Sequence, residues 1–333
     1  MIFKQPLLEF LKENFIPLYR ADQLLHAVYG EGKNTYESIK TLPQNLRKQL
    51  EENFPIFSFT VKKEVVSKSG DVIKTLFKLK DGAEIEGVLM KFKNGRKTVC
   101  VSSQVGCGLK CAFCATGAMG FKRNLKAEEI VDQVLYFGRV TNVVFMGMGE
   151  PFLNYDEVMK AVRIMNDPDL IGIAARRITI STSGIIPGIK ALADENVQVN
   201  LAVSLHAPNQ TLREKLMPIA KSYKLSELME AIKEYIKKTH RRVSYEYVML
   251  YGINDSQESA MALAKLIKGQ MCHVNLIPYN ETYLGFKNAG KDRINKLAEI
   301  LKSFNIPVTV RVSLGQEISA ACGQLRNVIT RAR

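Results

Sequence analysis

From residue 97 onward, short apolar runs alternate with longer stretches of helical period. The runs are KTVCVS, NVVFMGMG, RITIST, VNLAVSL, SYEYVML and HVNLIPY, and they are followed by stretches such as EEIVDQVLYF and LSELMEAIKEYIKK. This alternation predicts six parallel strands joined by crossover helices, with PVTVRVSL as a possible seventh strand. Six units are too few for the usual closed eight-fold barrel, so a partial β/α barrel and a doubly wound sheet both fit. In either α/β fold, we expect chemistry at the carboxyl ends of the strands.

The first 96 residues show two other patterns. LLEFLKENF, RADQLLHAVYG and LPQNLRKQLEENF place apolar residues three or four apart, which predicts a small helical accessory domain over residues 1–60. The runs FSFTVKKEVV, VIKTLFKLK, EIEGVLMKF and RKTVCVS instead alternate apolar and polar residues between glycine-containing turns, which predicts antiparallel hairpins. We therefore expect a β-hairpin extension over residues 61–96 and the α/β core over residues 97–333.

The chain carries a strong excess of positive charge. Its 333 residues include 47 Lys plus Arg against 33 Asp plus Glu, a formal net charge of +14, with 46% hydrophobic and 24% charged residues. This composition excludes a largely disordered protein, and the charge makes a polyanion such as nucleic acid the first partner to consider. No apolar run approaches the roughly eighteen residues of a membrane helix, so we expect a soluble, cytoplasmic protein with no membrane partner.

Several basic clusters are candidates for contact with nucleic-acid phosphates. Most individual lysines are solvated surface residues, so the argument concerns the summed field of each cluster. The clusters are Lys122-Arg123 near the expected active site, Arg176-Arg177, Lys237-Lys238 with Arg241-Arg242, and Arg47-Lys48 in the helical domain.

Cys107, Cys111 and Cys114 follow the first core strand in the order C-x-x-x-C-x-x-C. Such a loop can place three soft thiolates around one centre, which suits an iron–sulfur cluster, zinc or copper(I). Three ligands leave one iron of a [4Fe-4S] cluster open, whereas a structural zinc takes four protein ligands. Cys100 could be the fourth, but it lies inside an apolar strand, about 20 Å of extended chain from Cys107. We expect an iron–sulfur cluster, with zinc and disulfides as alternatives.

The same segment resembles a known family. CGLKCAFC is similar to the signature of radical S-adenosylmethionine (SAM) enzymes, and SSQVGCGLKCAFCATGAMGFKRNL resembles the RNA adenine methyltransferases that modify 23S ribosomal RNA. The resemblance continues through GMGEPFLNYDEV, RRITISTSGIIPGI, VNLAVSLHAPN, HVNLIPYN and AACGQL, and so spans nearly the whole chain. It implies a partial (β/α)6 radical SAM barrel with an N-terminal helical domain, which agrees with the pattern of strands and helices.

The resemblance also implies cofactors and their ligands. Cys107, Cys111 and Cys114 would hold a [4Fe-4S] cluster, whose open iron binds the amino and carboxylate groups of SAM. Two SAM molecules would be used per turnover, and an electron from a donor such as flavodoxin or ferredoxin would cleave one of them to a 5′-deoxyadenosyl radical. The residues that match the family's SAM contacts, all near strand ends, are Gly149, Glu150, Ser181, Ser204, Leu205, His206 and Asn280.

Two further cysteines receive roles from the resemblance. Carbon 2 of adenine is electrophilic and carries no acidic proton, so it cannot attack a methyl sulfonium directly and a radical route is required. By resemblance, Cys322 takes a methyl group from one SAM, and the radical from the second SAM abstracts a hydrogen from that methyl group. The methylene radical adds to adenine, Glu86 accepts the ring proton, and Cys100 attacks the sulfur of Cys322 to release the product. Cys272 matches no family position, and we expect it in the core.

The resemblance therefore implies methylation of carbon 2 of an adenosine in the peptidyl-transferase region of 23S rRNA, and of the adenosine next to the anticodon in tRNAs. Two alternatives stay open. A sister group methylates carbon 8 of the same rRNA adenosine and confers antibiotic resistance, and Pro151, where that group usually has Ala, favours carbon 2. A non-catalytic, zinc-containing RNA-binding module fits only if the cysteines hold zinc.

Overall fold

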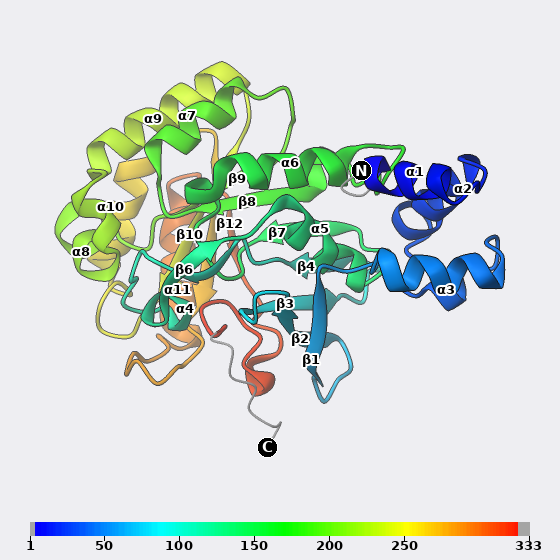
Figure 1. Cartoon of the computed structure of the whole chain (residues 1–333). Helices are drawn as coiled ribbons and strands as arrows, with labels where there is room; N and C mark the ends of the chain where they lie inside the picture. The colour runs from blue at the N-terminus through cyan, green and yellow to red at the C-terminus, as the bar shows by residue number, and fades with distance from the viewer. Residues whose placement is uncertain (1–3, 326–333) are drawn as a thin grey trace.

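The computed structural model describes residues 4–325, and the described chain begins with a group of helices. These are α1 (Lys4–Glu13), α2 (Tyr19–Leu25), a π-helical turn η1 (His26–Gly30), a 3-10 turn η2 (Tyr36–Ser38) and α3 (Gln44–Asn53). Leucines four residues apart on one helix side, Leu7 with Leu11 and Leu46 with Leu50, are buried. Figure 1 shows these helices to one side of the sheet. Helices therefore form where the apolar spacing predicts them.

A ten-stranded sheet follows, and its first four strands are antiparallel neighbours. They are β1 (Phe59–Val66), β2 (Val72–Leu79), β3 (Glu84–Lys91) and β4 (Lys97–Cys100). The turns between them contain Gly70, Gly82 and Gly95 at positive φ, a conformation that side chains with a Cβ rarely adopt. The hairpins predicted from the alternating pattern are therefore present.

β4 also begins a run of parallel strands that pair in chain order. The run continues through β7 (Asn142–Phe145), β8 (Ile178–Thr182), β9 (Asn200–Ser204), β10 (Val243–Met249), β11 (Cys272–Pro278) and β12 (Val308–Val310). The strand order never reverses, whereas a doubly wound sheet reverses at its switch point. The parallel part is therefore a partial barrel, and β12 is the possible seventh strand.

Crossover helices connect the successive parallel strands. They are α5 (Ala127–Tyr136), α6 (Tyr155–Asn166), α7 (Ile186–Asp194), α8 (Gln210–Leu216), α9 (Leu225–Thr239), α10 (Gln257–Ile267) and α11 (Lys291–Ser303). In α9, Leu228, Ile232 and Tyr235 are buried at the spacing of a 3.6-residue period. Short 3-10 turns lie in the connections and after β12: η3 (Pro151–Asn154), η4 (Ala175–Arg177), η5 (Pro218–Lys221) and η6 (Gln316–Ile318). Over residues 4–325, no helix is long and apolar enough to cross a membrane.

The connection after β4 contains a small second sheet that the sequence pattern does not predict. β5 (Gln104–Cys107) pairs with β6 (Gly120–Asn124), and the one-turn helix α4 (Ala115–Ala118) lies between them. This segment is rich in Gly and Cys and follows neither the helical nor the strand period. A Cβ on Gly106 would lie 1.9 Å from the carbonyl oxygen of Gly120, so the hairpin requires glycine there. The hairpin frames the loop that carries the three clustered cysteines.

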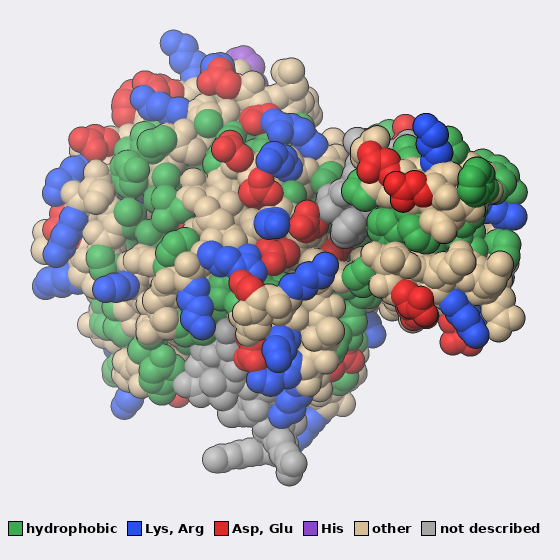
Figure 2. All heavy atoms as spheres, in the orientation of Figure 1, with side chains coloured by type: hydrophobic (Ala, Val, Ile, Leu, Met, Phe, Trp, Pro, Cys, Tyr) green, Lys and Arg blue, Asp and Glu red, His purple; other side chains and the backbone are tan. Residues whose placement is uncertain are grey.

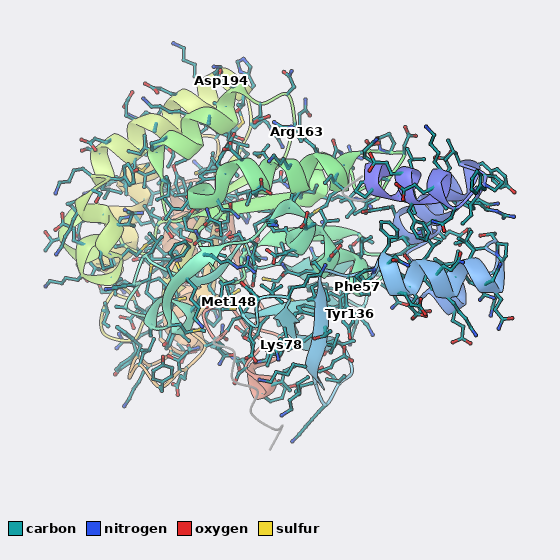
Figure 3. All side chains as sticks on the ribbon, viewed as in Figure 1. Phe57, Lys78, Tyr136, Met148, Arg163 and Asp194 are labelled. Carbon is teal, nitrogen blue, oxygen red and sulfur yellow. The ribbon has the colours of Figure 1, made fainter. Side chains whose placement is uncertain are left out.

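A cluster of aromatic rings joins the antiparallel strands to the barrel. The Phe77 ring on β2 is buried, with its centroid 4.1 Å from that of Phe59 and 5.1 Å from that of Tyr136. Phe57 also packs against Tyr136, and Figure 3 labels both residues where the N-terminal helices meet the sheet. Because Tyr136 lies on α5, the rings fix the antiparallel strands against the first crossover helix.

We expect the substitution Phe77→Ala to destabilise the protein by about 3–5 kcal/mol, since it leaves a cavity between β2 and α5. The matched control is Phe15→Ala, because the Phe15 side chain is 97% exposed. We expect that substitution to change the free energy of unfolding by less than about 0.5 kcal/mol. Urea denaturation followed by circular dichroism measures both, and similar losses in the two variants would contradict the role of the aromatic cluster.

Candidate active site

One pocket lies at the carboxyl ends of the parallel strands. Its walls come from the ends of β7 to β11, from the cysteine loop and from the segment after β12. Carboxyl ends of parallel strands meet at one edge, which explains why residues far apart in sequence gather here. Of the residues predicted for the site, the pocket is lined by Cys107, Cys111, Cys114, Gly149, Glu150, Ser181, Ser204, His206, Asn280 and Cys322. Leu205, Cys100 and Glu86 are not among its lining residues.

The three clustered cysteines face this pocket. Cys107 ends β5, and Cys111 and Cys114 lie in the turn before α4, where the amide of Cys114 donates to the carbonyl of Cys111 over 3.1 Å. Burial raises the pKa of Cys107 to about 12. Burial, together with the charges of the neighbouring thiols, raises the pKa of Cys111 well above its usual range. Thiols bind metals as thiolates, so a metal centre bound here must displace their protons.

This donor set fits an iron–sulfur cluster, because three soft sulfur ligands line one pocket. Cys100, the alternative fourth ligand for zinc, lies in β4 and not in the pocket lining. All six cysteines are free thiols, so the alternative of structural disulfides does not hold. Over residues 4–325, no three His, Cys, Asp or Glu side chains surround a single-ion site. A cluster of four irons occupies more room than one ion and can reach thiols that are set further apart.

The loop after β7 packs unusually close to the chain that leads into the cysteine loop. A Cβ on Gly147 would lie 2.6 Å from the carbonyl oxygen of Val101. A Cβ on Gly149, which has a φ of +101°, would lie 2.5 Å from the Cβ of Gln104. Both positions therefore require glycine for the contact between these two segments.

Glu150 is fixed in the pocket wall by its own backbone and by two neighbouring amides. Its amide donates to Oε1 of Gln104 over 2.9 Å. Its carboxylate accepts from the amide of Phe152 over 3.1 Å and from the amide of Ser183 over 2.7 Å. A carboxylate accepts hydrogen bonds only, so Glu150 suits a ligand group that donates them, such as an amino group. Burial raises the pKa of Glu150, and the two amides oppose that rise.

His206 is buried in the pocket wall in one defined tautomer. Its Nδ1 accepts from the amide of Val248 over 3.1 Å, so the proton of the neutral ring lies on Nε2. Burial lowers the pKa of His206 to about 3, with a further contribution from Arg213, so the ring is neutral at pH 7. Ser204, at the end of β9, lines the pocket beside it, whereas the side chain of Leu205 is fully buried and is not part of the lining.

The segment after β12 carries Cys322 into the pocket and is held there by several other elements. Asn280, after β11, donates from Nδ2 to the carbonyl of Cys322 over 3.2 Å. The carbonyl of Gly323 accepts from the amide of Ala115 over 2.9 Å, and the Thr116 hydroxyl donates to the carbonyl of Leu325 over 2.6 Å. Figure 1 shows this red segment close to α4 and the first strands. These contacts place Cys322 beside the three clustered cysteines.

Cys100 lies close enough to Cys322 for their charges to interact. It pairs with Val88 of β3 and Val144 of β7, and burial raises its pKa far above the usual range, with a further rise from a Cys322 thiolate. Cys322 is exposed toward the pocket, where surrounding protein raises its pKa and the Arg311 guanidinium lowers it. Both groups are thiols at neutral pH, and each must lose a proton to act as a nucleophile.

Glu86 lies outside the pocket, although the sequence comparison suggested a role in catalysis. Its side chain is completely buried and forms an ion pair with Lys74, whose Nζ lies 3.0 Å from Oε1 of Glu86. The same Nζ donates to the carbonyl of Ser319 over 3.1 Å. The pair therefore contacts the segment that carries Cys322, three residues before the thiol.

Two charged residues of the site were missed by sequence reasoning. Glu246 on β10 lines the pocket and accepts from Nδ2 of Asn275 over 2.7 Å. Arg311, just after β12, lies with Nη2 3.7 Å from Oε2 of Glu246 and 3.9 Å from the Met146 sulfur. A charge inside the apolar run SYEYVML was the available signal for Glu246, because a buried strand carries a carboxylate only with partners.

Arg123 forms ion pairs that the sequence did not predict. Its guanidinium forms two hydrogen bonds of 2.8 Å with the Glu129 carboxylate, and its Nε donates to Asp81 over 2.6 Å. These two carboxylates neutralise the charge that was expected to meet phosphate, whereas the neighbouring Lys122 is exposed.

Comparisons with known proteins agree with this site. Residues 101–264 match the Radical SAM superfamily. A protein from Thermoanaerobacter sp. (strain X514), named "Probable dual-specificity RNA methyltransferase RlmN", is 45% identical over 99% of both chains. The "Ribosomal RNA large subunit methyltransferase N" of Nitrosopumilus maritimus (strain SCM1) is 46% identical over 93% of both chains. The crystal structure of a radical SAM methyltransferase from Sphaerobacter thermophilus is 47% identical over 98% of both chains, with a TM-score of 0.91.

The names of both relatives state a methyltransferase activity, and their identity and coverage are high. The alternative of a non-catalytic zinc module is therefore wrong. The superfamily match covers the three clustered cysteines and most of the strand ends that line the pocket. The superfamily implies a [4Fe-4S] cluster and SAM, for which the three thiols provide the donor set. The chain therefore belongs to the radical SAM RNA methyltransferases and is a SAM-dependent enzyme that methylates RNA.

Proposed function

We propose that this enzyme methylates carbon 2 of one adenosine in the peptidyl-transferase region of 23S rRNA, and the adenosine next to the anticodon in tRNAs. The observation that carries the proposal is the position of Cys322 in the same pocket as Cys107, Cys111 and Cys114. A thiol beside a cluster and its SAM can carry a methyl group to a carbon that is not nucleophilic. Relatives named for dual specificity support two classes of RNA substrate.

In this proposal the cofactors supply the reactive groups, and the residues of the pocket bind them. When bound, a [4Fe-4S] cluster on the three thiols and two SAM molecules per turnover supply the methyl group and the radical chemistry. Glu150 offers carboxylate acceptors to the SAM amino group, and Asn280 and His206 offer polar groups from neighbouring strand ends. Ser181 and Ser204 add hydroxyls at the ends of β8 and β9. We assign the SAM site to these residues.

We assign Cys322 as the methyl carrier and Cys100 as the thiol that releases it. The Cys322 sulfur, once deprotonated, displaces the methyl group of SAM and becomes a thioether. After the carrier carbon is joined to adenine, and one electron has returned to the redox centre and the ring proton has been removed, the Cys100 sulfur attacks the Cys322 sulfur and forms a disulfide. The electron pair of the broken carbon–sulfur bond stays on the carbon, which takes up a proton and becomes the methyl group of the product. A thiol reductant then returns both cysteines to thiols before the next turnover. The electrostatic interaction between the two sulfurs supports this pairing.

Glu86 is our candidate for the proton acceptor. In its ion pair with Lys74, Glu86 is a carboxylate, and a carboxylate is the form that can accept a proton. Because Lys74 also bonds the carbonyl of Ser319, access of adenine to Glu86 requires displacement of the segment that carries Cys322. We therefore propose that RNA binding and movement of this segment are coupled.

The charge of the protein supports RNA as its macromolecular partner. The net charge of +14 favours a polyanion. Figure 2 shows Lys and Arg side chains spread over the visible face in several groups, with Asp and Glu between them. We propose that these groups share the phosphate contacts and that a flavodoxin or ferredoxin in the cytoplasm supplies the electrons.

Nucleoside mass spectrometry of rRNA and tRNA tests the position of methylation. We expect a host strain that lacks 2-methyladenosine to regain it in both RNAs when it expresses this protein, and not when it expresses the Cys322→Ala variant. Recovery of 8-methyladenosine instead would replace the proposal with the carbon-8 activity. Recovery in rRNA alone would remove tRNA from the substrates.

The cluster assignment has its own test. We expect the anaerobically reconstituted protein to bind about four irons per chain and to release 5′-deoxyadenosine from SAM. Substitution of Cys107, Cys111 or Cys114 by Ala is expected to abolish both. Cys272→Ala is the matched control, because Cys272 is buried on β11 outside the pocket. Full iron content and SAM cleavage in a variant of a clustered cysteine would show that the ligand set is wrong.

The proposed roles of Cys322 and Cys100 can be distinguished, because the loss of each thiol is expected to stop the reaction at a different step. Cys322→Ala is expected to give neither methylated RNA nor a protein–RNA adduct, since no carrier sulfur is present. Cys100→Ala is expected to accumulate a covalent adduct with RNA, since no thiol breaks the carrier bond. A denaturing gel of each variant purified with its RNA shows the adduct as a slow, nuclease-sensitive band. The double variant Cys100→Ala with Cys322→Ala is the control and is expected to show no such band. Absence of the band in the Cys100→Ala variant would contradict the proposed mechanism.

A further inference from the structure

Arg213 on α8 is a charged side chain in a position where proteins rarely leave one. Its side chain is completely buried, and by residue volume it is the largest of the fully buried side chains among the described residues. Its guanidinium forms no ion pair with any carboxylate in the described part of the chain, residues 4–325. An arginine stays protonated in proteins, so its burial without a counter-charge is strongly unfavourable. Such a residue is retained where something supplies the opposite charge.

The guanidinium lies between two loops that line the cofactor pocket. Nη2 donates to the carbonyl of Ser183 over 2.7 Å and to the carbonyl of Ser204 over 3.4 Å, which joins the loop after β8 to the end of β9. A Cβ on Gly184 would lie 3.0 Å from the same Nη2, so the loop after β8 packs directly on the charge. Nε and Nη1 are buried without a hydrogen-bond partner among the described residues. Carbonyl dipoles alone therefore do not neutralise this cation.

The same helix is bonded to the cysteine loop. The carbonyl of Leu216, the last residue of α8, accepts from the amide of Ala112 over 2.9 Å. Ala112 directly follows Cys111, and Ser183 and Ser204, whose carbonyls accept from Arg213, line the same pocket as the three clustered cysteines. The buried cation is thus bonded to residues of the pocket in which three cysteine thiolates bring negative charge when they hold a metal centre.

We propose that Arg213 is the buried counter-charge of the iron–sulfur site, and that it makes the cluster easier to reduce. Three thiolates around the cluster add negative charge, and reduction adds one more electron. A fixed cation behind the loop stabilises the reduced state more than the oxidised state, because the attraction grows with the negative charge. Arg213 is thus a positioning residue that acts through the cluster. The inference rests on the cluster ligands in the proposed function and is independent of the RNA product.

The experiment compares Arg213→Met, which removes the charge, with Arg213→Lys, which retains it. Arg163→Met is the matched control, since Arg163 loses the same charge from an exposed ion pair with Glu195. Iron content and the cluster midpoint potential, followed by electron paramagnetic resonance, are measured in anaerobically reconstituted protein. We expect a more negative potential in Arg213→Met and wild-type potentials in Arg213→Lys and Arg163→Met.

The iron content and the folding of Arg213→Met also test the proposal. If metal-free Arg213→Met is folded but takes up less iron than Arg213→Lys, the counter-charge is needed for cluster assembly, which also supports the proposal. If Arg213→Met does not fold, Arg213→Lys decides, because a wild-type potential supports the role of charge and a negative shift overturns it. A fully loaded Arg213→Met with an unchanged potential overturns this inference alone. A wild-type protein without a cluster overturns the proposed ligand set as well.

Discussion

Parallel pairing of the barrel strands in chain order is the constraint on which the site depends. The parallel strands β4 and β7 to β11 end at the same edge of the sheet, so a few residues after each strand are enough to build one pocket. Glycines allow the first two of these strand ends to approach closely, since Gly147 and Gly149 leave no room for a side chain. Short connections are then enough to bring the cysteine loop, the residues after the strands and Cys322 together in that pocket.

The C-terminal segment is the part of the site that the barrel does not place by itself. It has no regular structure around Cys322, and it is held by hydrogen bonds to Asn280, to α4 and to Lys74. Each such bond contributes about 0.5–1.5 kcal/mol net, so the segment is anchored by local contacts rather than by a large buried core. This kind of attachment suits the proposed role of Cys322, in which its thiol meets SAM, RNA and Cys100 in turn.

Sequence reasoning succeeded where a residue's role follows from local period or spacing. Apolar alternation located the strands, and the three-cysteine motif located one side of the pocket. Tertiary contacts could not be predicted in this way. The side chain of Leu205 points into the core, Arg123 is neutralised by Glu129 and Asp81, and Glu86 is buried against Lys74. Arg213 gave no sequence signal, because its helix is short and its charge looks like that of any surface arginine.

The antiparallel strands have a consequence for how the molecule avoids self-association. β3 occupies the outer edge of β4, so β4 and β12 cannot meet, and the open sheet has two ends that could recruit strands from other molecules. One end is β12, with only three residues. The other is β1, where a bulge after Val61 and the exposed charges of Lys62, Lys63 and Glu64 disturb a regular edge. A short strand and a bent, charged strand are both poor templates for intermolecular sheets, and they leave this unclosed barrel protected against edge-to-edge aggregation.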